Sequence, residues 1–164
     1  VDDDGLDVAP GAEGEICTRG PELFMGYLDP TLNESAFLQG GWYRTGDVGR
    51  LDEDGYLLIT DRKKDIIIRG GENISSKEVE AVLLTHPSII DAAVVAVPDE
   101  RMGEVVRACV VLAPGSSLTL ENVRDHFRAS AIARQKTPER LSFFAELPRN
   151  ASGKVLKHEL RRMP

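Results

Sequence analysis

The order of strand-like and helix-like segments in the second half of the chain leaves few folds open to it. The apolar residues recur with strand and helix periods in turn. The segments are a β-branched strand IIIRG closed by Gly70-Gly71, a helix over 75–87, strands IIDAAVVAVPD and GEVVRACVVLAPG, a helix over 119–130, a strand over 141–147 and a final helical turn KHELRR. This order is typical of a small α+β domain. We predict a β-hairpin and a three-stranded sheet flanked by helices.

Both longer helices carry a recognisable start signal. Ser75 or Ser76 can cap the first helix, and Thr119 can cap the second, because a side-chain oxygen accepts a free amide of the first turn. In the second helix Val123 and Phe127 stand one turn apart, so they predict its buried face.

The first part of the chain has mostly strand signals. Residues 13–19 alternate in the manner of a strand, and residues 30–37 form a short helical pattern that starts near Thr31. Asp54-Gly55 lies between two apolar runs, which predicts a β-hairpin.

Charge divides the chain at about the same place as these patterns do. Residues 1–61 carry 14 acidic and 3 basic side chains, a net charge of −11, whereas residues 62–164 carry 13 acidic and 17 basic ones, a net charge of +4. The two values give the overall charge of −7. We therefore predict two units, 1–61 and 62–164, the second of which tolerates anions.

Composition excludes several functional classes. The basic residues are interleaved with acidic ones, which argues against a nucleic-acid partner. No apolar run approaches the roughly 18 residues of a transmembrane helix. Cys17 and Cys109 lie in strand patterns and do not form a disulfide framework, so we predict a cytoplasmic protein. The chain starts with Val1 and has no signal peptide pattern, so we expect that it begins within a longer protein or has been processed.

Three polar clusters each allow a structural or a functional interpretation. Asp47 in YRTGD either caps its own turn or binds two vicinal hydroxyls, as acidic residues do with a ribose. Arg62 and Lys64 in DRKKD belong either to a solvated connector or to an anion site beside a hinge. Gly70 and Gly71 form either a tight turn or a surface where a ligand passes close to the backbone.

A fourth cluster, LPRNASGK, ends in Lys154 after a Ser-Gly pair. It is either a solvated turn or a flexible loop that brings an ammonium group to an anion. It is not a phosphate-binding P-loop, since Pro148 and Val155 occupy positions that need glycine and Ser or Thr.

Taken together and in this order, the clusters closely resemble those of the adenylate-forming (AMP-binding) superfamily. The matching runs are GEICTRGPELFMGY, GWYRTGD, GYLLITDRKKDIIIRGGENISSKEVE, VPDERMGE and LPRNASGK. The sequences of these motifs resemble the acyl-CoA synthetase and fatty-acid–CoA ligase branch more than the peptide-synthetase adenylation modules. Those modules usually have Asp where Lys64 stands. Asp61 replaces a glycine that many members carry before the arginine.

The resemblance implies a two-step ligase reaction. A carboxylic acid attacks the α-phosphate of ATP to give an acyl-adenylate and pyrophosphate, and the thiol of CoA then displaces AMP. By this likeness Lys154 is the catalytic lysine of the first step, and Asp47 and Arg62 bind the nucleotide. Lys64 is the hinge of a rotating C-terminal domain, and Gly70 and Gly71 border the channel for the CoA pantetheine.

The resemblance also implies what lies outside this chain. Residues 1–61 would be the β-rich end of a large N-terminal AMP-binding domain, and residues 62–164 the mobile C-terminal domain. The phosphate loop, the contacts to magnesium and the acyl pocket would lie upstream, so we expect these residues alone to be inactive. Expected partners are that upstream domain, a carboxylic acid, CoA and a lysine acyltransferase or deacylase acting on Lys154. Two alternatives stay open: an adenylation module that loads a carrier protein, and a non-catalytic binding or regulatory descendant.

Overall fold

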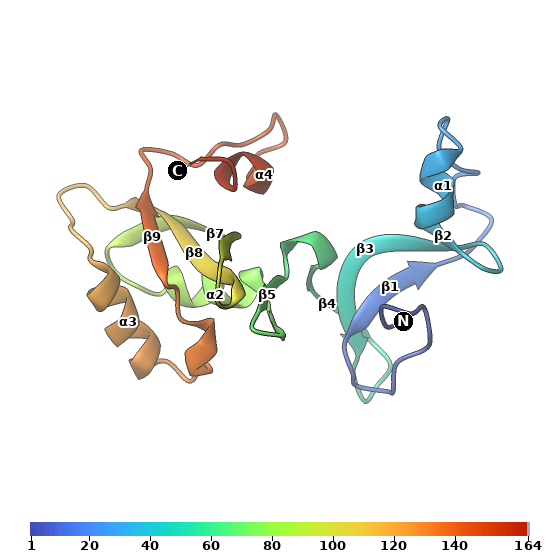
Figure 1. The fold of residues 1–164 in the computed structure, drawn as a ribbon, viewed down its shortest axis with the longest axis horizontal. Helices are drawn as coiled ribbons and strands as arrows, with labels where there is room; N and C mark the ends of the chain where they lie inside the picture. The colour runs from blue at the N-terminus through green and yellow to red at the C-terminus, as the bar shows by residue number, and fades with distance from the viewer. Residues whose placement is uncertain (164) are drawn as a thin grey trace. The chain divides into compact units, whose positions relative to one another are not determined.

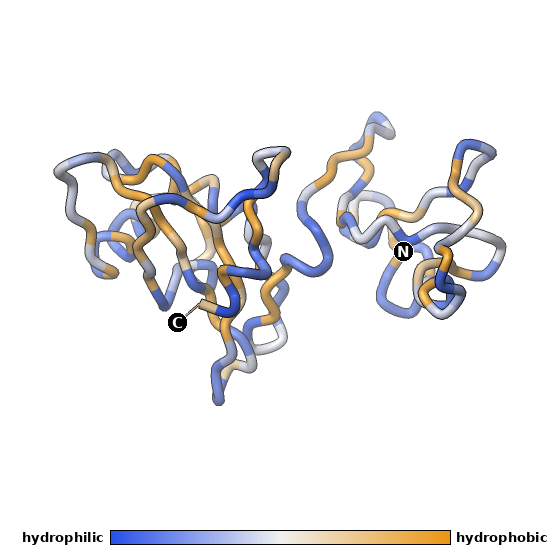
Figure 2. Tube along the Cα trace, turned by 90° about the horizontal axis from the view of Figure 1, so that it is seen from above, coloured by the Kyte–Doolittle hydropathy of each residue, from blue (hydrophilic) through white to orange (hydrophobic). Residues whose placement is uncertain are grey.

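The computed structural model describes residues 1–163, which form two compact units (Figure 1). Unit 1 comprises Val1–Lys64, and unit 2 begins at Asp65. The expected boundary followed residue 61, so the observed division falls three residues later. The segment that joins the units is strongly hydrophilic, as the blue stretch of the trace shows in Figure 2.

Unit 1 is built around one long strand. β3 (Trp42–Leu51) pairs antiparallel with β1 (Gly14–Thr18), β2 (Phe37–Leu38) and β4 (Leu57–Arg62). The predicted hairpin is confirmed, since Asp54-Gly55 lies in the turn between β3 and β4. The short helix α1 (Thr31–Ala36) also begins where the sequence predicts.

Unit 2 has the α+β fold predicted from the sequence, in the predicted order. After the 3-10 turn η1 (Lys63–Asp65) come β5 (Ile67–Arg69), β6 (Glu72–Ile74), α2 (Ser76–Leu83), β7 (Ile89–Asp99), β8 (Gly103–Leu112), α3 (Leu120–Ala129), the 3-10 turn η2 (Arg134–Lys136), β9 (Arg140–Phe143) and α4 (Lys157–Leu160). One five-stranded sheet contains all these strands, in the order β6-β5-β8-β7, with β9 parallel to β8. The hairpin β5–β6 is thus continuous with the expected three-stranded sheet, and β9 ends at Phe143 instead of residue 147.

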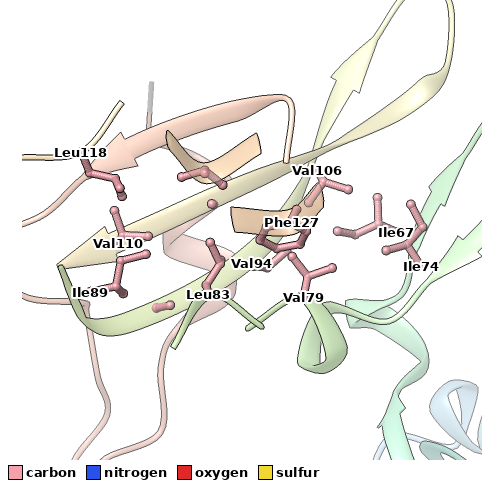
Figure 3. Close-up of a cluster of buried hydrophobic side chains, with 13 residues drawn as sticks. Ile67, Ile74, Val79, Leu83, Ile89, Val94, Val106, Val110, Leu118 and Phe127 are labelled. Carbon is pink, nitrogen blue, oxygen red and sulfur yellow. The ribbon is translucent and has the colours of Figure 1, made fainter. Parts of the chain in front are cut away.

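Both faces of this sheet are buried. Side chains alternate along a strand, so Val94 and Val106 pack with Phe127 of α3 and Val79 of α2 on one face (Figure 3). Cys109 and its neighbours pack on the opposite face. That second cluster contains Ala93, Val95, Cys109, Val111, Leu147 and Leu160. The sequence pattern predicted the first face, and burial of the second depends on α4.

Side chains satisfy backbone groups at the ends of the helices in unit 2. Arg107 is buried in β8 and donates to the carbonyl oxygens of Leu160 and Met163 in the C-terminal segment. The predicted caps are confirmed, because Ser75 accepts from the amide of Glu78 and Thr119 accepts from that of Asn122.

Cys17 and Cys109 are free thiols. Within residues 1–163 no helix is both long enough and apolar enough to cross a bilayer.

A histidine pair between α2 and α3 makes the stability of unit 2 depend on pH. Burial, followed by the nearby charge of His126, lowers the pKa of His86 below its ordinary value of 6.5. The two rings lie 5.0 Å apart, and Nδ1 of His86 accepts a hydrogen bond from the amide of Ser88, a role that only an unprotonated nitrogen can play. A folded-state pKa below the unfolded one contributes stability above pH 6.5, which is lost as pH falls through the folded value.

We therefore expect the melting temperature of unit 2 to fall on acidification from neutral pH to about pH 5, beginning near the unfolded pKa of histidine. His86→Asn should reduce this pH dependence, measured by circular dichroism, because an asparagine oxygen can still accept from Ser88 but does not titrate. His158→Asn is the matched control, since His158 is exposed on α4. An unchanged pH profile in His86→Asn would contradict the assignment.

Candidate functional site

Asp47 and Arg62 are direct neighbours on adjacent strands of unit 1. They face one another in the β3–β4 register, and Nε of Arg62 donates to Oδ1 of Asp47 at 2.8 Å. Asp47 lies within β3, which continues through the bulge beside Val48. Within residues 1–163 its second carboxylate oxygen accepts no hydrogen bond. The pair thus presents a half-exposed guanidinium and a carboxylate with room for a hydroxyl donor.

The surroundings of this pair include an acidic residue that the sequence did not single out. Glu15 in β1 is 7% exposed, and its Oε2 accepts from Arg44 at 2.6 Å and from Lys63 at 3.1 Å. Burial raises the pKa of Glu15, but the hydrogen bonds from Lys63 and Arg44 outweigh it, so the pKa lies below its ordinary value of 4.5. Lys63 is therefore held in unit 1 by structural ion pairs, beside Arg62 and Lys64. Only the β1–β3 pairing could have revealed this role.

The carboxylate of Asp61 orders the start of the connection between the units. Asp61 is 2% exposed and its Oδ1 accepts from the amide of Arg62 at 2.7 Å. Lys64 is the last residue of unit 1 and lies in η1. The proposed hinge residue thus stands at the boundary between two compact units.

Gly70 and Gly71 form the turn of the β5–β6 hairpin in unit 2. Both have positive φ values, +57° and +85°, which residues with a Cβ rarely adopt. A Cβ on Gly70 would meet the end of the Met102 side chain at 2.6 Å, whereas a Cβ on Gly71 would meet nothing within 4 Å. The turn therefore requires glycine, and the backbone at Gly71 is open.

Lys154 is exposed on the loop between Leu147 and α4, in unit 2. Among the described residues its ammonium group makes no ion pair or hydrogen bond. Two side chains close the loop: Arg149 donates a hydrogen bond to the carbonyl oxygen of Gly153, and Oδ1 of Asn150 accepts one from the amide of Lys154. Gly153 has a φ of +79°, which favours glycine. Lys154 is thus a free cation on an ordered backbone, while Asp47 and Arg62 belong to the other unit.

Unit 2 also has a cavity of about 350 Å³ lined by arginines. Its charged lining consists of Arg69, Arg124, Arg128, Arg134 and Glu139. Nε of Arg69 donates to Glu139 at 2.6 Å, and the two helical arginines pair with acids of α3. Three of the four arginines are thus paired with carboxylates, which offsets much of the positive charge of the cavity.

No metal-binding group is evident in this part of the chain. Residues 1–163 contain no cluster of three or more His, Cys, Asp or Glu side chains that could hold an ion.

Comparison with known proteins gives a consistent relationship. Residues 78–154 match the family described as AMP-binding enzyme C-terminal domain. The chain is 54% identical over 164 residues to a medium-chain fatty-acid–CoA ligase of Escherichia coli (strain K12), covering 99% of this chain and 29% of that protein. It therefore spans less than a third of the length of this relative.

Solved structures agree in fold. ATP-bound MatB from Rhodopseudomonas palustris has a TM-score of 0.91 and 36% identity, covering 98% of this chain and 32% of that one. The o-succinylbenzoate CoA synthetase MenE from Bacillus subtilis, in complex with its acyl-adenylate intermediate, has a TM-score of 0.85 and 39% identity, covering 96% and 32%. Other structures of the same synthetase contain AMP, or ATP and a magnesium ion. Residues 78–154 are therefore similar to the AMP-binding enzyme C-terminal domain family, and proteins similar to the whole chain include a fatty-acid–CoA ligase and an o-succinylbenzoate CoA synthetase.

Proposed function

We propose that this chain is the C-terminal part of an ATP-dependent, AMP-forming acyl-CoA ligase of the fatty-acid branch, working in the cytoplasm. The observation that carries the proposal is the 54% identity along 99% of the chain to a medium-chain fatty-acid–CoA ligase. Since the chain spans 29% of that relative, the upstream AMP-binding domain would supply the acyl pocket, the phosphate loop and the contacts to magnesium.

In the first step a carboxylate oxygen of the acid attacks the α-phosphorus of ATP, and pyrophosphate leaves. Negative charge gathers on the oxygens around that phosphorus, and a positioned ammonium group stabilises it in a site closed to water. Lys154 is suited to this role because it is exposed and its ammonium group has no partner among residues 1–163. Asp47 would hold the ribose hydroxyls with its open carboxylate oxygen, beside Arg62.

In the second step the thiol sulfur of CoA attacks the acyl carbonyl carbon, and AMP leaves with the bonding electrons. Unit 2 would rotate about Lys64 between the steps, which withdraws Lys154 and brings Gly71 to the pantetheine. The open backbone at Gly71 supports this role.

Lys154 is also accessible to an acyltransferase, since its ammonium group is exposed on a surface loop. Acylation would remove the charge that the first step needs, so a deacylase would restore activity.

The proposal is tested by comparing the full-length parent protein with the 164-residue chain. With ATP, magnesium and a panel of aliphatic and aromatic acids, we expect the parent to release AMP and form a thioester when CoA is added, and the 164-residue chain to form neither product. Mass spectrometry of the products measures both. Acyl transfer only to a carrier protein would favour the adenylation-module alternative. If the parent releases no AMP with any acid of the panel, a non-catalytic descendant is favoured. Thioester formation by the 164-residue chain alone would contradict the need for the upstream domain.

A further inference from the structure

The peptide bond that leads into Lys154 is held at both of its polar atoms. Nη1 of Arg149 donates to the carbonyl oxygen of Gly153 at 2.7 Å. The amide of Lys154 donates to Oδ1 of Asn150 at 2.9 Å. These two atoms belong to a single planar peptide unit, so two different side chains fix its orientation.

The rest of the loop is closed around the same two residues. The amide of Asn150 donates to the carbonyl oxygen of Lys154, and the amide of Gly153 donates to that of Asn150, both at 2.9 Å. An antiparallel bridge joins Arg149 to Val155 at the base of the loop. Both backbone polar groups of Lys154 are therefore bonded to Asn150.

Arg149 also connects the loop to the sheet of unit 2. Its Nη2 donates to Oδ2 of Asp91 at 2.5 Å, and Oδ1 of Asp91 accepts from the amide of Ala92. Asp91 lies in β7, whose side chains pack into both buried clusters. The guanidinium thus bridges β7 and the carbonyl group that precedes Lys154, which a planar fork of donors can do.

We propose that Arg149 and Asn150 are positioning residues for Lys154, and that Asp91 anchors them to the fold. The inference rests on the proposed function of Lys154. A lysine side chain is flexible, so the place of its ammonium group is limited mainly by the backbone that carries it. A fixed backbone lowers the entropy lost in the transition state, and misplacement by about 1 Å can cost on the order of 10²-fold in rate. Lys154 then enters and leaves the site with unit 2 as a body, without rearrangement of its own loop.

The test uses Asn150→Ala and Lys154→Ala, alone and combined, in the full-length parent. Adenylation is assayed from acid and ATP, and thioester formation from supplied acyl-adenylate and CoA. We expect Asn150→Ala to lower kcat for adenylation by about 10- to 100-fold, with KM for ATP and thioester formation unchanged. In the Lys154→Ala background, Asn150→Ala should cause no further loss, because it acts only through Lys154.

Two further variants keep the test independent of misfolding. Glu146→Ala is the matched control, since Glu146 is exposed and lies outside the loop that holds the Gly153–Lys154 peptide, and we expect wild-type rates. Arg149→Lys should lose adenylation in part, because one ammonium group cannot reproduce the bridge between Asp91 and Gly153.

Multiplicative losses in the double variant, or equal loss of both half-reactions in Asn150→Ala, would overturn the positioning role. If Lys154→Ala slows adenylation and Asn150→Ala does not, the positioning role is refuted and the proposed function is unaffected. Normal adenylation by Lys154→Ala would instead refute the proposed role of Lys154 itself.

Discussion

Replacing Lys154 with alanine in the full-length parent is expected to slow acyl-adenylate formation by about 10²- to 10³-fold, the usual loss when one stabilising donor is removed from a transition state. Thioester formation from supplied acyl-adenylate and CoA should be retained, because in the proposed mechanism Lys154 would be withdrawn in the second step. The variant thus separates the two half-reactions. Pyrophosphate release measures the first, and thioester yield measures the second.

The matched control is Arg162→Ala, which removes another exposed cation from the C-terminal segment. It should leave both half-reactions unchanged. Equal loss of both in Lys154→Ala would mean that the loop has a structural role. Full activity in both would mean that PRNASGK is only a surface turn.

Phe127→Ala is expected to destabilise unit 2 by about 3–5 kcal/mol, the usual cost of truncating a buried aromatic side chain. Phe127 is 2% exposed and packs in the same buried cluster as Val79 of α2 and Val94 of β7, so its removal leaves a cavity there (Figure 3). Urea unfolding followed by far-UV circular dichroism measures the change. Trp42, the single tryptophan, belongs to unit 1 and reports separately on that unit.

Phe143→Ala is the control for Phe127→Ala, since Phe143 is 54% exposed at the end of β9. We expect its effect to lie within about 0.5 kcal/mol of zero, as for most surface substitutions. Similar losses in the two variants would contradict the packing described for α3.

Local signals predicted much of the fold, because they act within a few residues. Ser75 and Thr119 cap their helices through side-chain bonds to the next turn, and Asp54-Gly55 closes a hairpin between adjacent strands. The predicted end of β9 at residue 147 was wrong, since the length of β9 depends on how far it pairs in parallel with β8.

The candidate site was predicted from the resemblance residue by residue, but its interactions were not. Asp47 and Arg62 appear as separate clusters in the sequence, and only the β3–β4 register brings them within 2.8 Å. Glu15 gave no signal, because its role depends on burial beside Arg44 and Lys63. Asn150 could have been identified, since asparagine commonly bonds to backbone amides a few residues ahead.

By itself the sequence determined the order of the elements, the division of charge and the motif residues, because periodicity, capping and charge are properties of the chain. The tertiary structure decided the burial of the second sheet face by α4 and the anchoring of the Lys154 loop through Arg149 and Asp91. These contacts join residues far apart in the chain. Their geometry depends on strand register and packing, which local sequence patterns do not specify.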